Sequence, residues 1–261
     1  MRALQIAATG MAAQQMRVEV ISNNLANMNT TGYNTRRAEF ADLHYQQMAR
    51  AGTINAADGT VLPTGVQLGL GVRPAAVTMD LAQGVLAATG GDLDIAIEGN
   101  GFFEVTLPSG LSAYTRDGAF QRSADGQVVT AEGYPLVPDI TIPVDARSIS
   151  LNADGEFYAY FSDTPEPQLL GQITLATFSN AKGLEAIGGN MFIETNASGA
   201  PTVDAPGVDG FGTLRQGYLE SSSVDAVREV TELIEAQRGY ELNSKVITAA
   251  DQMLAATTQV R

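Results

Sequence analysis

The stretch of sequence that decides the fold is residues 22–33, Ser22-Asn23-Asn24-Leu25-Ala26-Asn27-Met28-Asn29-Thr30-Thr31-Gly32-Tyr33. Its first four residues still fit a helical pattern, whereas its second half collects asparagine, threonine and glycine. Asparagine and threonine side chains compete for backbone hydrogen bonds, and glycine accepts left-handed backbone geometry. The cluster therefore predicts that a helix ends here.

The spacing of apolar residues before this stop signal predicts a helix over residues 3–25. The apolar positions lie at steps of four, three, seven and seven, which is heptad spacing: Leu4, Ala8, Met11, Val18 and Leu25. Gln15 and Ser22 fall on the same seam, so the stripe is partly polar.

A second heptad pattern predicts a helix over residues 223–260, where the only glycine is Gly239 and proline is absent. Ser223 and Asp225 precede the apolar run and suggest an N-cap. The apolar positions of this pattern are Val227, Val230, Leu233, Tyr240, Ile247 and Leu254.

A helix of this length spans roughly 57 Å and must bury its stripe. One interpretation is an ordinary helical hairpin that caps a β domain. The interpretation we favour is that both stripes pack against neighbouring copies of the chain.

The middle of the chain switches to the two-residue period of β-strands at about Asp92. Turn signals recur there at a spacing of roughly 8–12 residues, which is typical of an all-β sandwich or a partly closed barrel. Strands are expected at residues 93–97, 102–107, 111–115, 119–122, 128–130, 140–142, 149–151, 157–161 and 172–178. Residues 34–80 fit neither pattern and are expected to form an extended connector with short strands.

The predicted fold class is therefore α+β, with long terminal helices that form a coiled coil and a central all-β domain. We expect three parts: residues 1–33 with 222–261 as the coiled-coil core, residues 34–80 as the connector, and residues 81–221 as the β domain.

The formal net charge is -14, and 18 acidic against five basic residues lie between Asp80 and Arg215. Near-neutral ends can pack closely with copies of themselves, whereas the acidic middle repels.

Composition excludes several classes of function. The chain has no Cys and a single His, His44, so thiol catalysis, a disulfide framework and a histidine-rich metal site are not expected. The acidic balance argues against nucleic-acid binding, and no apolar run is long enough to span a membrane. Asp92 and Asp94 could pair as acid and base, but alternation favours two solvated edge residues. We expect no enzyme activity, no cofactor and no metal.

Four ordered motifs resemble the flagellar rod and hook family. The first is the stretch from Ser22 to Tyr33, whose core is Ser-Asn-Asn-Leu-Ala-Asn. The others are Gly99-Asn100-Gly101-Phe102-Phe103, then Tyr114-Thr115-Arg116-Asp117-Gly118-Ala119-Phe120, and finally residues 216–224 with Gln237-Arg238-Gly239-Tyr240-Glu241. Two departures are Asn34, where relatives often carry lysine, and Gly239, where alanine is common.

The resemblance implies a structural subunit of the distal rod, which polymerises into a rigid helical tube and transmits motor torque to the hook. The implied partners are other copies of the chain, proximal rod and hook or hook-junction proteins, the outer-membrane and peptidoglycan ring proteins, and the flagellar export apparatus. The implied location is the basal-body rod in the periplasm, reached by type III export, with no nucleic acid bound and no membrane insertion.

Two alternatives remain open from the sequence. A proximal rod or hook protein of the same family differs in connector length. A secreted binding module, in which the helices only oligomerise a ligand-binding β domain, would form a discrete closed oligomer instead of a tube.

Overall fold

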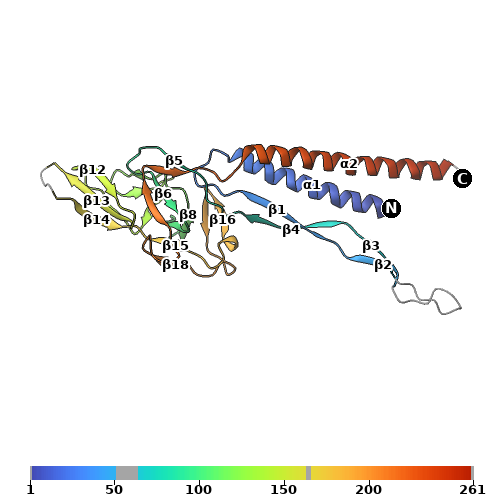
Figure 1. Ribbon diagram of the computed structural model, residues 1–261, viewed down its shortest axis with the longest axis horizontal. Helices are drawn as coiled ribbons and strands as arrows, with labels where there is room; N and C mark the ends of the chain where they lie inside the picture. Colours follow the sequence, from blue (N-terminus) through green and yellow to red (C-terminus); the bar gives the residue numbers. More distant parts are fainter. Residues whose placement is uncertain (1, 51–63, 163–165, 260–261) are drawn as a thin grey trace. The chain divides into compact units, whose positions relative to one another are not determined.

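The computed structural model describes residues 2–50, 64–162 and 166–259 (Figure 1). The fold is α+β, with one helix at each end of the chain and a β-rich region between them. The chain forms two compact units. The helical unit comprises Met1–Leu25, Arg36–Thr78 and Asp225–Arg261, and the β unit comprises Ala26–Thr35 and Met79–Val224.

The two helices end close to where the sequence predicts. Helix α1 spans Arg2–Ala26 and helix α2 spans Ala226–Gln259. The cap of α2 is Asp225, whose Oδ1 accepts the backbone N–H groups of Val227 at 3.0 Å and Arg228 at 3.3 Å. Ser223 does not cap this helix, because its hydroxyl pairs with Thr35 instead.

Four strands in the region of the expected connector lie mainly in the helical unit. They are β1 (Arg36–Asp42), β2 (Tyr45–Ala49), β3 (Val66–Gly69) and β4 (Val72–Met79). Strand β1 pairs with β4, and β2 pairs antiparallel with β3. Residues 51–63, which carry part of the connector prediction, lie outside the described residues.

The β unit is built around an antiparallel sheet of short strands. The central sheet has the order β16-β17-β8-β7-β15-β18, with β11 also paired to β7, and smaller pairings join β12-β13-β14, β19-β6, β20-β5 and β10-β9. The bounds are β5 Leu86–Ala88, β6 Ile95–Glu98, β7 Phe102–Thr106, β8 Ser112–Thr115, β9 Gln121–Arg122, β10 Val128–Val129, β11 Leu136–Val137, β12 Ala146–Leu151, β13 Glu156–Phe161, β14 Gln168–Gln172, β15 Leu175–Thr177, β16 Glu185–Gly188, β17 Met191–Ile193, β18 Thr202–Asp204, β19 Thr213–Gln216 and β20 Tyr218–Glu220. A single 3-10 turn, Ala181–Gly183, lies between β15 and β16.

Strand β7 is covered on both of its faces. Successive side chains of a strand point to opposite sides, and both Phe102 and Phe103 are buried. Phe103 packs edge-to-face on Phe120, with ring centroids 5.1 Å apart, in the larger hydrophobic core. Phe102 belongs to a second core with Tyr114 and Phe192. The central sheet therefore holds two apolar layers together.

The structure differs from the predicted strand list at two of the predicted positions, and it contains short strands that the list lacks. Residues 140–142 form no strand, although Ile140 and Ile142 are buried in the core and Thr141 bridges Gln127. The expected strand at 172–178 is divided, since β14 ends at Gln172 and β15 begins at Leu175. Short strands such as β5 and β18, three residues each, are too brief to show a period in the sequence.

Candidate functional site

Asn24 joins three elements of the helical unit. Its side chain is 1% exposed, and its Nδ2 donates to the carbonyl oxygen of Arg36 at 2.8 Å and to Glu229 Oε2 at 3.1 Å. Its Oδ1 accepts the backbone N–H of Arg36 at 3.0 Å. One side-chain amide thus links α1 to β1 and to α2. These hydrogen bonds explain why the motif has an asparagine at position 24.

The two helices run antiparallel, and most of the residues buried between them are small or polar. Gly239 lies against Gln14, since a Cβ added to Gly239 would lie 3.1 Å from Gln14 Cδ. Gly10 lies in the same way against Asn243, at 3.0 Å from Nδ2. The buried residues of the pair are Ala7, Ala13, Ile21, Asn24, Glu229, Ala236 and Ala250. Glycine and alanine let two helix backbones approach closely, and Ile21 is the one large apolar side chain among these buried residues.

An ion-pair cluster also links the two helices further along. Arg17 Nη2 lies 3.3 Å from Glu232 Oε2 and 3.7 Å from Glu235 Oε2, and Arg228 Nε lies 3.2 Å from Glu232 Oε1. Partial burial acts to raise the pKa of Glu232, but hydrogen bonds from Arg17 and Arg228 outweigh it and hold that pKa below its ordinary value.

The predicted packing residues lie mostly outside this buried face. On α1, Ala8 is exposed and Leu4, Met11, Val18 and Leu25 are half-buried. On α2, Leu233 and Ile247 are half-buried, whereas Val227, Val230, Tyr240 and Leu254 are exposed. Ile234, Leu242, Val246 and Met253, which the heptad pattern did not include, are also exposed. The large apolar side chains of α2 therefore point mainly away from α1.

A groove of about 500 Å³ lies on the helix pair. It brings together two of the predicted packing residues, Val18 of α1 and Tyr240 of α2, with Gln15, Gln237 and Glu241 around them. The groove is thus lined by both helices, with apolar surface from each.

A second cluster, in the β unit, unites residues from all four sequence motifs. We call it the motif junction and define it as Gly32, Gly99, Gly101, Arg116 and Glu220. Arg116 Nε lies 2.8 Å from Glu220 Oε2, and the exposed fractions of these two side chains are 8% and 4%. The guanidinium Nη atoms also donate to the carbonyl oxygens of Gly99 and Gly101, each at 3.1 Å.

Glu220 receives two further hydrogen bonds in the motif junction. Its Oε1 accepts the N–H of Gly84 at 2.9 Å, and its backbone carbonyl accepts the N–H of Gly32 at 2.8 Å. Gly32 has φ 62°. A Cβ added there would lie 2.8 Å from the backbone carbon and oxygen of Arg116, so the chain passes close to the backbone of Arg116.

Thr31 ties the same segment to the neighbouring loops. Its hydroxyl donates to Asp117 Oδ1 at 2.8 Å, and its carbonyl accepts from Asn190 Nδ2 at 2.7 Å. The backbone carbonyl of Asn190 in turn accepts a hydrogen bond from the Thr115 hydroxyl at 2.9 Å.

Gly118 cannot carry a side chain, because a Cβ would fall 1.6 Å from the carbonyl oxygen of Ile95.

The segments at the ends of the β unit, next to its connections to the helical unit, are hydrogen-bonded to each other. The N–H of Ser223 donates to the carbonyl of Tyr33 at 3.0 Å, and the N–H of Thr35 donates to Ser223 Oγ at 2.9 Å. The N–H of Asp80 donates to the carbonyl of Thr35 at 2.8 Å. Hydrogen bonds at Thr35 therefore join three segments of the chain, around residues 33–35, 80 and 223.

The first motif is divided between the two units. Ser22, Asn23 and Leu25 lie on α1, where Ser22 and Asn23 are exposed, and Ala26 ends that helix. Asn27 accepts the Thr30 hydroxyl with Oδ1 at 3.1 Å, and Gly32 and Tyr33 are buried in the β unit.

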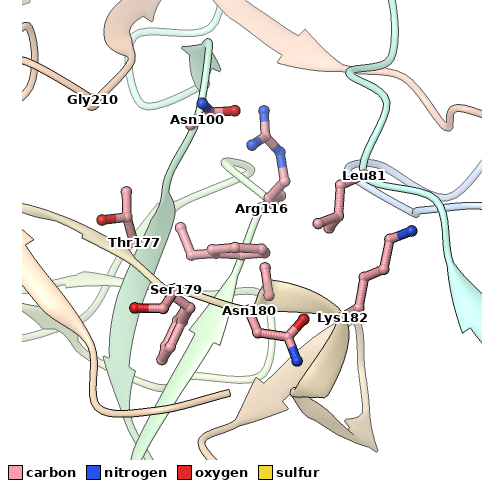
Figure 2. A pocket seen from close by; sticks show the side chains of 11 residues that line it. Leu81, Asn100, Arg116, Thr177, Ser179, Asn180, Lys182 and Gly210 are labelled. Carbon is pink, nitrogen blue, oxygen red and sulfur yellow. The ribbon is translucent and has the colours of Figure 1, made fainter. Parts of the chain in front are cut away.

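An open pocket of about 490 Å³ lies beside the motif junction (Figure 2). Figure 2 shows Arg116 and Asn100 on one side of it and Lys182 and Asn180 on another. Its lining includes the aromatic rings of Phe102 and Phe178, and no acidic residue belongs to it. Arg116 is already engaged by Glu220 and two carbonyls, so this pocket offers no convergent set of catalytic groups.

The described residues contain no group of three or more metal-ligating acidic or histidine side chains. Neither described helix is both long and apolar enough to cross a membrane. Asp94, one of the two carboxylates considered for acid–base chemistry, instead accepts a hydrogen bond from the Thr89 hydroxyl.

Sequence reasoning missed the motif junction and the polar face of the helix pair. The spacing of Ala7, Gly10, Gln14, Arg17, Ile21 and Asn24 is also heptad spacing, at steps of three and four. A search restricted to large apolar residues cannot detect such a face. The pairing of Arg116 with Glu220, 104 positions apart, leaves no local signal.

Comparison with known proteins accounts for both ends of the chain and part of the β unit. Residues 4–34 match the flagella basal body rod protein family, residues 96–159 match the D1 domain of the flagellar hook protein FlgE/F/G, and residues 215–260 match the C-terminal region of flagellar basal body rod FlgEFG proteins. The chain therefore belongs to the family of flagellar basal-body rod proteins.

Within that family the chain is similar to FlgG. It is 54% identical over 261 residues to the flagellar basal-body rod protein FlgG of Caulobacter vibrioides, with all of both chains covered. It is 50% identical to FlgG of Agrobacterium fabrum, with 97% of each chain covered, and 44% identical to FlgG of Borreliella burgdorferi, with 100% and 99% covered. The chain is thus a structural protein of the flagellar basal-body rod and not an enzyme.

Proposed function

We propose that this protein is a subunit of the distal rod and polymerises into a rigid helical tube, which acts as a drive shaft between motor and hook. In this proposal the terminal helices form an inner coiled-coil layer. The β unit forms the outer wall, and residues 34–80 brace neighbouring subunits.

The outward position of the apolar side chains on α2 carries this proposal. Val227 is 78% exposed, Leu242 63% and Met253 64%. A surface helix that buries small and polar residues within its own molecule and exposes large apolar ones needs further partners. Copies of the same chain supply such partners in a helical filament with heterologous contacts.

The distribution of charge is consistent with the proposed layers. Between Asp80 and Arg215 the acidic residues exceed the basic ones by 18 to five, whereas the remaining residues carry 11 and ten. A near-neutral inner layer can pack densely, and an acidic outer wall keeps a surface that resists non-specific association.

The proposed partners follow from the same assembly. They are further copies of the chain, the proximal rod and hook or hook-junction proteins at the two ends, and the outer-membrane and peptidoglycan ring proteins around the wall. Transport through the flagellar type III export apparatus into the periplasm is part of the proposal.

Polymerisation of the purified full chain tests the proposal. The variant V230S/I234S/V246S removes apolar groups that are each 42–48% exposed, and circular dichroism of the monomer checks that the helices still form. Complete burial of such a side chain is worth about 1.5–3 kcal/mol, and the exposed half about 1 kcal/mol. Three losses amount to about 3 kcal/mol, which raises the critical concentration roughly 100-fold.

The matched control is Q252S, which shortens an exposed polar residue on the same helix. We expect Q252S to polymerise like the unchanged chain, as measured by sedimentation and electron microscopy. Tubes of equal yield from the triple variant, or a closed oligomer from the unchanged chain, would contradict the proposal.

A further inference from the structure

The Arg116–Glu220 ion pair is buried, and both of its side chains make further hydrogen bonds. The guanidinium has a carboxylate oxygen and two carbonyl oxygens as acceptors, and the carboxylate has a second donor in Gly84. The pair therefore connects four backbone segments: the Gly84 segment, the Gly99–Gly101 loop, the end of β8 and the strand β20.

Stability of the β unit does not by itself require such a pair. Replacement of a buried ion pair by apolar residues of similar volume is often neutral or stabilising, whereas removal of one partner leaves a buried charge and costs about 3–5 kcal/mol. The geometric specificity of the pair is what an apolar replacement cannot reproduce. A planar guanidinium fixes two carbonyls and a carboxylate at once.

The position of the pair indicates what this specificity orders. The carbonyl of Glu220 holds the N–H of Gly32, and the backbone of Arg116 lies directly against Gly32. A few residues on, Tyr33 and Thr35 are bonded to Ser223. The ion pair thus lies next to residues 30–35, which follow α1 in the sequence, and next to residues 220–224, which precede α2.

We propose that Arg116 and Glu220 are a positioning pair for assembly: they order residues 30–35 and 220–224 together, and that order is required for a subunit to join the filament. The inference rests on the proposed polymerisation. It assigns to the pair a role that exceeds stabilisation of the β unit, in which both residues lie.

Two variants separate positioning from stability. R116M/E220L replaces the pair by apolar side chains of similar length, and R116K keeps the charge but loses the planar fork of donors. The matched control is R215K, which alters an exposed pair of the same unit, where Arg215 Nη1 lies 3.7 Å from Glu98 Oε2. All three are made in the full chain.

Three measurements are compared: thermal unfolding of the β unit followed by near-ultraviolet circular dichroism, hydrogen exchange at the N–H of Gly32 and Ser223, and the critical concentration for polymerisation. We expect R116M/E220L to remain folded with a lowered thermal midpoint, because the carbonyl groups of Gly99 and Gly101 and the N–H of Gly84 lose their side-chain partners. We expect the N–H groups of Gly32 and Ser223 in R116M/E220L to exchange at least tenfold faster than in the unchanged chain. We expect the critical concentration of this variant for polymerisation to rise at least tenfold. R215K should match the unchanged chain in every measurement.

The proposal is overturned if R116M/E220L folds and polymerises like the unchanged chain. If the double variant does not fold, R116K decides: a critical concentration equal to that of R215K overturns the proposal, and a tenfold rise supports it. Failure of the unchanged chain to polymerise would refute the proposed function instead. In that case unaltered exchange at Gly32 in R116K would still overturn the ordering role.

Discussion

Substitution of Gly32 by alanine tests the close passage of the chain against the ion pair. Gly32 has φ 62°, a left-handed conformation that glycine adopts freely and alanine does not. An alanine Cβ would lie 2.8 Å from the backbone carbon and oxygen of Arg116 and 2.9 Å from the N of Asp117. These are backbone atoms, so no flexible side chain can move aside.

The expected loss of stability has two parts. Left-handed geometry costs an alanine roughly 1–2 kcal/mol, and a methyl group forced into a filled space costs about 1–3 kcal/mol. Alanine also lowers the conformational entropy of the unfolded chain, and this effect stabilises the folded state by about 0.4–1 kcal/mol. We expect G32A to lower the free energy of unfolding of the β unit by about 1.5–4 kcal/mol.

The chain offers a control that isolates the steric part. Gly110 has φ 81°, and a Cβ added to it would meet no atom within 4 Å. G110A should therefore show the left-handed cost alone. Guanidinium unfolding of both variants, followed by tyrosine fluorescence and circular dichroism, gives the comparison.

The two outcomes are distinct. A loss in G32A that exceeds the loss in G110A by at least about 1 kcal/mol supports the close contact with Arg116. Equal losses, within about 0.5 kcal/mol, would refute it and would mean that the segment around residue 32 can move away from the ion pair at little cost.

Three further predictions concern the helical unit. D225A removes the cap of α2 and should cost about 1 kcal/mol, seen as faster amide exchange at Val227 than in the unchanged chain. The pKa of Glu232 is lowered in the folded state, so its contribution is present above its ordinary pKa and is lost as the pH falls through the folded value. Acidification should thus weaken the helix pair by less than about 1 kcal/mol, and E232Q should abolish that part of the pH dependence. N24A should cost about 1–3 kcal/mol, because the N–H and carbonyl of Arg36 lose a buried partner, and unaltered exchange at the Arg36 amide would contradict this.

The sequence alone predicts the fold class and both helices well, because each helix carries a sustained period and a clear stop or cap signal. The expected range 3–25 differs by one residue at each end from α1. Strands with alternating large side chains, such as Ile95–Glu98 and Phe102–Thr106, are also found where expected. In contrast, strands of three or four residues near the C-terminal end of the β unit depend on neighbours far along the chain.

The candidate packing face could be predicted only in part. Large apolar residues at heptad spacing identify the surface left open, but they do not identify the face buried between α1 and α2. That face is specified by Gly10, Gly239 and the hydrogen bonds of Asn24, whose effect depends on close approach and not on hydrophobicity. The coiled-coil role of the apolar positions and the three-part division of the chain stay predictions.

The hydrogen bonds at Thr35 hold several ends of the β unit close together. Thr35 is hydrogen-bonded to both Asp80 and Ser223, so three of the points at which the chain enters or leaves this unit lie close together. A module with its ends gathered in this way can lengthen, shrink or be exchanged at its far loops while the spacing of those connections is preserved. Fluorescent tags for imaging live motors would therefore be best inserted at a turn such as Pro108–Gly110, where a Cβ added to the glycine meets no neighbour.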